Sequence, residues 1–99
     1  MRNLSNNIRI KVKVLSDPLI RIVGIEETDI VVNKGRFSLN ELINTLKSLI
    51  PNLEKVFQTR RLGREVFIAV NGQVIYDLNK VVELGGESRI SIFTLGAGG

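Results

Sequence analysis

The chain has 99 residues, with 14 Lys and Arg against 10 Asp and Glu, and it contains no Cys and no His. This length fits one domain of common size, and 43% hydrophobic with 24% charged residues is typical of a globular protein. The composition excludes disulfides, thiolate nucleophiles, Cys-containing zinc sites and histidine bases. Catalysis by this chain would depend on carboxylates, Lys, Tyr or Ser alone, so a role other than that of an enzyme is favoured.

The net charge of +4 permits an acidic partner or nucleic acid without requiring either. No run of about 18 apolar residues is present, so neither a transmembrane helix nor a membrane partner is expected. Residues 1–7 are polar, lack the apolar segment of a signal peptide, and are expected to form a flexible N-terminus. We therefore expect a cytoplasmic protein.

The first predicted element is a strand over residues 8–14, where apolar and basic side chains alternate strictly. Alternation with a period of two and β-branched apolar positions is typical of a half-buried strand. Ser16-Asp17-Pro18 predicts a turn, and residues 19–25 are apolar but interrupted by Arg and Gly, so their structure stays open. Residues 28–33 predict a second, short strand.

A helix is predicted to begin at Ser38, because Ser38 and Glu41 have the spacing of a capping box. Pro51 ends it, since proline lacks an amide hydrogen and disfavours helical geometry in the residue before it. Apolar residues at three- and four-residue steps form one stripe along this helix. They are Leu39, Leu42, Ile43, Leu46, Leu49 and Ile50. A further short turn at 53–57 is expected to pack under the core.

The C-terminal half predicts three strands. Residues 66–70 and 74–76 are separated by Asn71-Gly72, the strongest short-range signal of a hairpin, because both residues tolerate positive φ. After a break at Leu84-Gly85-Gly86, residues 89–95 predict the last strand. One helix with an apolar stripe and several strands with one apolar face each predict a two-layer α+β domain. The first and last strands alternate most clearly and are expected at the centre of the sheet.

The chain ends in Gly96-Ala97-Gly98-Gly99, directly after the last predicted strand. Three glycines in four residues bury almost nothing and cost backbone entropy when ordered, so a frayed terminus is one interpretation. The other is a flexible functional tail over 96–99, since four extended residues reach roughly 13–14 Å. Without a Cβ at Gly98 and Gly99, such a tail fits a slot too narrow for side chains. Its reactive group would be the C-terminal carboxylate, presented to the active site of another protein.

Several stretches resemble the ubiquitin-like sulfur carriers, which comprise the MoaD and ThiS proteins, the ubiquitin-related modifier and the small archaeal modifier proteins. The stretches are Val70-Asn71-Gly72, Asp77, Leu84, Gly85-Gly86-Glu87 and Ile90-Ser91-Ile92-Phe93-Thr94-Leu95-Gly96-Ala97-Gly98-Gly99. Glu87 stands where the family usually has Asp, and Thr94-Leu95 stands where MoaD proteins often have Pro-Pro. Thr-Leu before the tail is closer to the ubiquitin-related modifier.

The resemblance implies a β-grasp (ubiquitin-like) fold over residues 8–95, with a mixed sheet packed on one main helix. It also implies a carrier or protein modifier rather than an enzyme. A ubiquitin-activating-type enzyme, similar to MoeB or ThiF, would use ATP and Mg²⁺ to adenylate the carboxylate of Gly99. A sulfur donor would then convert the adenylate to a thiocarboxylate. Gly96 and Gly98 would give the tail access to that enzyme, and no cofactor bound by the chain itself is implied.

The resemblance leaves the use of the sulfur open. It implies synthesis of molybdopterin or thiamine thiazole, tRNA thiolation together with a tRNA-thiolating enzyme, or conjugation to lysines of target proteins. Two alternatives remain beside the carrier. The chain is the small subunit of molybdopterin synthase, with its tail inserted into the large subunit, or it is a basic β-grasp interaction or RNA-binding module with an incidental glycine tail.

Apolar residues on the outer face of the last strand are candidates for a docking surface. If Ile90 and Ile92 face the helix, Phe93 and Leu95 lie on the opposite face, and Phe67 is out of phase with the inward set of its own strand. Exposed apolar groups beside the tail would bind the activating enzyme, and Phe93 matches the position of an interface aromatic in the family. Alternatively, a bulge or loop covers these side chains.

Two groups of basic residues are candidate contacts for an acidic partner or for RNA phosphates. They are Arg9, Lys11 and Lys13 on the first strand and Arg60, Arg61 and Arg64 in the loop over 58–64. A solvated face is the more common interpretation, and no RNA-binding motif or interleaved aromatic residue accompanies them. Asp17, Asp29 and Asp77 are too scattered to predict a metal site.

Overall fold

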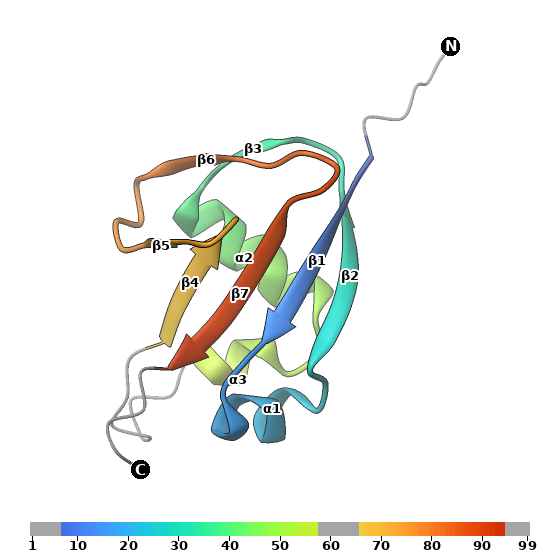
Figure 1. The fold of residues 1–99 in the computed structure, drawn as a ribbon, viewed down its shortest axis with the longest axis vertical. Helices are drawn as coiled ribbons and strands as arrows, with labels where there is room; N and C mark the ends of the chain where they lie inside the picture. The colour runs from blue at the N-terminus through green and yellow to red at the C-terminus, as the bar shows by residue number, and fades with distance from the viewer. Residues whose placement is uncertain (1–6, 58–65, 95–99) are drawn as a thin grey trace.

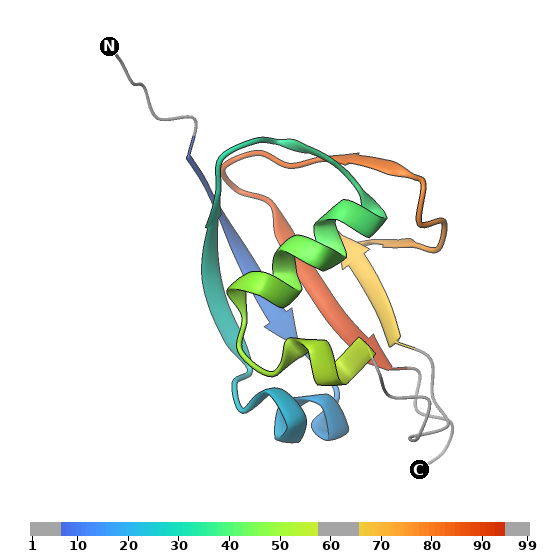
Figure 2. The same ribbon diagram turned by 180° about the vertical axis from the view of Figure 1, so that it is seen from behind.

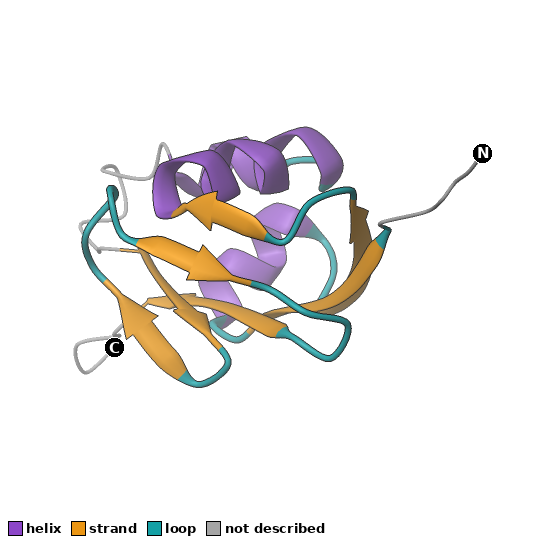
Figure 3. Ribbon diagram, turned by 90° about the horizontal axis from the view of Figure 1, so that it is seen from above, coloured by secondary structure: helices purple, strands orange, loops and turns teal. Residues whose placement is uncertain are grey.

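The computed structural model describes residues 7–57 and 66–94. A five-stranded sheet with the order β2-β1-β7-β4-β5 forms one layer. The helix α2 lies on one of its faces (Figure 3), and α1 lies beyond the end of β1 (Figure 1). A two-stranded sheet pairs β3 with β6. The elements are β1 (Ile8–Val14), α1 (Asp17–Val23), β2 (Glu27–Val32), β3 (Arg36–Ser38), α2 (Leu39–Leu49), α3 (Leu53–Phe57), β4 (Val66–Val70), β5 (Gln73–Ile75), β6 (Val81–Glu83) and β7 (Arg89–Thr94). The predicted α+β arrangement is confirmed.

The first and last strands lie in the interior of the sheet, as their alternation predicts. β7 is the middle strand and runs parallel to β1, with Val12 opposite Ile90 and Val14 opposite Ile92. The other pairings of this sheet, β1 with β2, β4 with β7 and β4 with β5, are antiparallel, so the sheet is mixed. The inward residues of both central strands are buried, which leaves the alternate residues of each strand on the outer face of the sheet.

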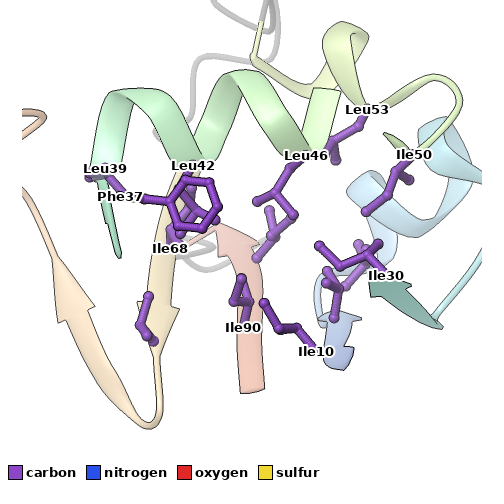
Figure 4. Packing of buried hydrophobic residues seen from close by; sticks show 14 of the residues in the cluster. Ile10, Ile30, Phe37, Leu39, Leu42, Leu46, Ile50, Leu53, Ile68 and Ile90 are labelled. Carbon is purple, nitrogen blue, oxygen red and sulfur yellow. The ribbon is translucent and has the colours of Figure 1, made fainter. Parts of the chain in front are cut away.

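The main helix α2 begins with the predicted capping box. Ser38 Oγ accepts a hydrogen bond from the Glu41 N–H at 3.1 Å, and Glu41 Oε1 accepts one from the Ser38 N–H at 2.9 Å. Figures 2 and 4 show the helix crossing the sheet and pointing its apolar stripe into the core. Of that stripe, Leu39, Leu42, Leu46 and Ile50 are buried and Ile43 is half-buried.

Leu49 departs from the predicted stripe, because 45% of it is exposed. It belongs to the last turn of α2, which ends at Leu49 before Ile50 adopts an extended conformation ahead of Pro51. The three-residue step from Leu46 places Leu49 about 300° round the helix axis, at the margin of the buried arc. The prediction that Leu49 packs in the core is therefore wrong.

The capping box makes the thermal stability depend on pH. The hydrogen bond from the Ser38 backbone, followed by the hydrogen bond and charge of Lys34, holds the pKa of Glu41 below its ordinary value of 4.5. Because the folded state binds this proton less tightly than the unfolded state, the stabilisation is present above the unfolded pKa and is lost as the pH falls through the folded pKa. A Glu41→Gln variant keeps a hydrogen-bonding oxygen but has no charge to titrate.

We therefore expect the wild type to melt above Glu41→Gln at about pH 6, and the difference in Tm to shrink as the pH falls to about 3. Melting curves of both proteins at several pH values measure it. The other carboxyl groups are the same in both proteins, so their contribution to the pH dependence cancels in the difference in Tm. A difference in Tm that stays constant over this range contradicts the role of the carboxylate.

Residues 17–23 form a helix where the sequence predicted a turn at Ser16-Asp17-Pro18 and left 19–25 open. Pro18 lies in the first turn of α1, where its missing N–H breaks no helical bond, and Asp17 is favourable at this end. Gly24 ends the helix with φ of 86°, a left-handed conformation that glycine adopts without steric cost. The single turn expected from Pro18 is therefore the start of a seven-residue helix.

The predicted hairpin and the turn at 53–57 are confirmed as the β4–β5 hairpin and α3. Asn71 and Gly72 connect β4 and β5 with φ of 51° and 85°. The short strands β3 and β6 were not predicted; each has three residues, too few for a period to be visible. Over 7–57 and 66–94 no helix is long and apolar enough to cross a membrane.

Candidate functional site

The strand that leads to the glycine tail is the middle strand of the sheet. β7 is flanked by β1 and β4, and its last residue, Thr94, is 8% exposed. In Figure 1 the end of β7 lies beside the start of β4 and near α1. The predicted tail residues Gly96, Gly98 and Gly99, together with Leu95, lie outside the described residues. What the structure defines is the place from which the tail starts.

Phe67 and Phe93 are brought together on the outer face of the sheet, as predicted. They are paired in the register of β4 and β7, and their rings stack with centroids 5.8 Å apart and planes inclined by 28°. Both side chains are half-buried. No loop of the described part of the chain buries them, so an apolar surface lies one residue before the end of the strand.

Tyr76 completes this surface and was missed by the sequence analysis. Its ring meets that of Phe67 edge to face, with centroids 6.0 Å apart, and 75% of it is exposed. A signal existed, because the two-residue turn at Asn71-Gly72 sets the register Ile68 opposite Ile75 and so places residue 76 beside residue 67. We call Phe67, Phe93 and Tyr76 the aromatic patch.

A shallow hollow continues from the aromatic patch round the edge of β4 and β5 toward the helices. It has a volume of about 260 Å³. Phe67 and Tyr76 line it together with Ile43 of α2, Phe57 of α3 and the 52% exposed Leu78. The apolar surface near the start of the tail is thus larger than the three rings.

The basic residues of β1 occupy the other half of the outer face. Lys11 and Lys13 lie 3.4 Å and 3.8 Å from the two carboxylate oxygens of Glu27 on β2, so part of their charge is compensated. Arg9 is exposed. Arg60, Arg61 and Arg64 lie outside the described residues. The described part of the outer face therefore joins an aromatic half on β4, β5 and β7 to a charged half on β1 and β2.

The start of β7 is anchored by Asn71, which accounts for one of the stretches that carry the family resemblance. Asn71 Oδ1 accepts a hydrogen bond from the Arg89 N–H at 2.9 Å, and the Asn71 N–H donates to the Arg89 carbonyl at 2.8 Å. The Asn71 amide also donates to the hydroxyl of the buried Ser88, at 3.4 Å. The hairpin residue thereby fixes the entry of the central strand.

We expect Asn71→Ala to lower the free energy of unfolding by about 0.5–1.5 kcal/mol more than Asn52→Ala does. Asn52 is the matched control, since its φ of 69° is also left-handed and the described residues offer its side chain no hydrogen bond. Both variants carry the same backbone strain, and only Asn71→Ala loses the bonds to β7. Urea unfolding of the three proteins measures the difference, and equal losses contradict the anchor.

No metal centre is indicated: within 7–57 and 66–94, no three acidic residues lie close enough together to hold an ion. Asp17 lies in α1, Asp29 in β2 and Asp77 in the segment between β5 and β6. A hollow of about 250 Å³ on the charged half contains both signs of charge, with Arg9, Lys11 and Arg89 facing Asp29 and Glu87. This mixture favours neither an anion nor a cation.

The topology, the helix on one face and the long central parallel pair define the class: the chain has the β-grasp fold. No family model matches the sequence, and no curated protein matches it. Ten solved chains match its structure.

One of these is a putative molybdopterin converting factor, subunit 1, from Pyrococcus furiosus. It has 24% identity and a TM-score of 0.62 over 88% of this chain and 97% of that one. SAMP1, a small archaeal modifier protein from Haloferax volcanii, has 19% identity and a TM-score of 0.64 over 92% and 99%. A complex of subunits 1 and 2 of the molybdopterin-converting factor from Helicobacter pylori contains a third, with 22% identity and a TM-score of 0.59 over 93% and 100%. The expected fold is thereby confirmed.

Proposed function

We propose that the chain is a ubiquitin-like sulfur carrier or protein modifier whose reactive group is the carboxylate of Gly99. The observation that carries the proposal is the aromatic patch, in which Phe93 of the central strand, close to its end, packs with Phe67 of β4 and with Tyr76. The fold shared with molybdopterin converting factor subunits and small archaeal modifier proteins supports it. A docking surface close to a C-terminal carboxylate is what a protein needs when another protein performs its chemistry.

The proposed reaction begins with an adenylyl transfer in a ubiquitin-activating-type partner, which brings ATP and Mg²⁺. A carboxylate oxygen of Gly99 attacks the α-phosphorus of ATP, the bond to the β-phosphate oxygen breaks, and pyrophosphate leaves. This makes the acyl carbon electrophilic, because AMP is a good leaving group where an oxide is not. Hydrosulfide, or an equivalent donor, then adds to the acyl carbon and expels AMP, and loss of the sulfur-bound proton leaves a thiocarboxylate.

The residues of this chain bind and orient rather than catalyse. Phe67, Phe93 and Tyr76 would pack against an apolar surface of the partner, with Leu95 extending the contact. Gly96 and Gly98 would allow the tail to enter a narrow channel. Arg9 and the loop residues Arg60, Arg61 and Arg64 would meet acidic groups at the rim, which speeds association more than it raises affinity. The proposed place of this ATP-dependent chemistry is the cytoplasm.

A second candidate is the small subunit of a molybdopterin synthase. It is favoured by the match to the Helicobacter pylori complex, in which subunit 1 of the molybdopterin-converting factor is bound to subunit 2. The two candidates share the thiocarboxylate and differ in what consumes it. Stable complex formation between this chain and a molybdopterin synthase large subunit would identify the second.

The test is an intact-mass measurement after incubation with a cognate activating enzyme, ATP, Mg²⁺ and a sulfide donor. We expect an adenylate without the donor, and with it a mass change that corresponds to replacement of one oxygen by sulfur. A chain without Gly99, and a Gly98→Val chain with a blocked approach, should show neither product. Absence of both products from the wild type, with an enzyme proven on another carrier, overturns the proposal.

A further inference from the structure

Ser16 makes two hydrogen bonds to the residue from which the tail starts. Its Oγ accepts from the Thr94 N–H at 2.7 Å and lies 3.3 Å from the Thr94 carbonyl oxygen, to which it donates. The two residues are 78 positions apart in the sequence. Ser16 holds the N-cap position of α1, yet its side chain makes no bond to that helix. A residue type that usually caps its own helix is here bonded to the end of β7.

The geometry of the sheet explains why the backbone groups at the end of β7 bond to a side chain. Successive residues of a strand turn their backbone groups to opposite neighbours, and the Ile92 carbonyl accepts from the Leu15 N–H at 2.9 Å on the β1 side. Thr94, two residues later, therefore also faces the β1 side. β1 ends at Val14, opposite Ile92, and the chain then enters α1. On the β1 side no strand of the described residues lies opposite Thr94, and the Ser16 hydroxyl bonds both of its backbone groups.

We propose that Ser16 is a positioning residue for the reactive tail, an inference that rests on the proposed function. On the β4 side, Phe93 is held by its pairing with Phe67, and on the β1 side only Ser16 holds Thr94 among the described residues. The bond thus holds the end of β7 in place. Gly99 is five residues beyond Thr94 (99 − 94), and a chain of that length reaches at most about 16–18 Å.

Because the tail is short, the point from which it starts determines which positions the carboxylate of Gly99 can reach. Without the bond from Ser16 to Thr94, the tail would start earlier along β7. It would then extend from the sheet in a wider range of directions. The carboxylate then spends less time in a productive position, although the docking surface is unchanged. This predicts a loss in the rate of adenylyl transfer with little change in the affinity of the complex.

The experiment compares four variants with the wild type. Ser16→Ala removes the hydroxyl, and Ser16→Thr and Ser16→Val are a pair of nearly equal shape of which only Ser16→Thr keeps it. Ser48→Ala is the matched control, because the Ser48 hydroxyl donates to the Thr45 carbonyl at 2.8 Å on the exposed side of α2. Thermal melting first confirms that each variant folds.

Two readouts are measured: amide hydrogen exchange at Thr94, and single-turnover adenylation together with the Kd for the activating enzyme. Without the hydroxyl, in Ser16→Ala and Ser16→Val, we expect exchange at Thr94 to rise about tenfold. The adenylation rate should fall about three- to tenfold at a Kd within about twofold of the wild type. Ser16→Thr and Ser48→Ala should match the wild type in both.

Unchanged exchange at Thr94, or unchanged adenylation in both variants without the hydroxyl, overturns the inference. A raised Kd with an unchanged rate also overturns it, because it would place Ser16 in the docking surface. Failure of the proposed function has a different signature: the wild type itself then forms no adenylate. In that case, hydrogen exchange at Thr94, which needs no enzyme, still decides whether Ser16 holds the end of β7.

Discussion

A Tyr76→Ala variant is expected to bind the activating enzyme about 10- to 50-fold more weakly than the wild type, since truncation of a central interface aromatic costs about 2 kcal/mol or more. Tyr76 is the most exposed member of the aromatic patch at 75%, and its ring contacts Phe67 at the patch centre. Because most of the side chain already faces solvent, its loss should change the stability of the free chain little. The Kd measured by titration calorimetry tests this expectation.

Val31→Ala supplies the matched control on the same face of the sheet. Val31 is 49% exposed and lies on β2, opposite Arg9 and so on the charged half. Its truncation should leave the Kd within about twofold, and Tyr76→Phe should retain most of the affinity. Similar losses from Val31→Ala and Tyr76→Ala would mean that the partner covers the whole outer face, which contradicts docking through the aromatic patch.

The aromatic patch also shows which features of the site can be predicted from the sequence. Alternation along β7 assigned Phe93 to the outer face, and the phase of β4 assigned Phe67 to the same face, because side-chain direction in a strand follows from position alone. That the two rings stack could not be read from either strand, since it depends on the register between residues distant in sequence. Tyr76 needed the register of the hairpin as well.

Predictions from local sequence signals with a direct physical cause are confirmed by the structure. The capping box of Ser38 and Glu41 and the hairpin turn Asn71-Gly72 are each a backbone requirement met by particular side chains. α1 was missed because a proline in the first turn of a helix and a proline in a turn look alike in sequence. The bond from Ser16 to Thr94 could not be predicted from the sequence. Nothing near Ser16 in the sequence indicates that the backbone groups at the end of a distant strand lack a partner in the sheet.

The largest expected effect on stability is that of Leu46→Ala, and Leu49→Ala on the same helix is its control. Leu46 is fully buried against the sheet (Figure 4), and Leu49, one turn later, is 45% exposed. Truncation of a buried leucine removes its contacts and leaves a cavity, which costs about 2–5 kcal/mol, whereas an exposed leucine costs less than about 1 kcal/mol. The better helix propensity of Ala reduces both losses slightly.

For a chain of this size, a loss of about 3 kcal/mol lowers the Tm by about 12–24 °C. Melting curves and urea unfolding of both variants measure the difference. Because both changes remove the same atoms from the same helix, the difference reports burial alone. Equal losses would mean that Leu49 packs in the core in solution, as its place in the apolar stripe predicts, and that the last turn of α2 is rotated toward the sheet. A small loss from Leu46→Ala would contradict the packing of α2 on β1 and β7.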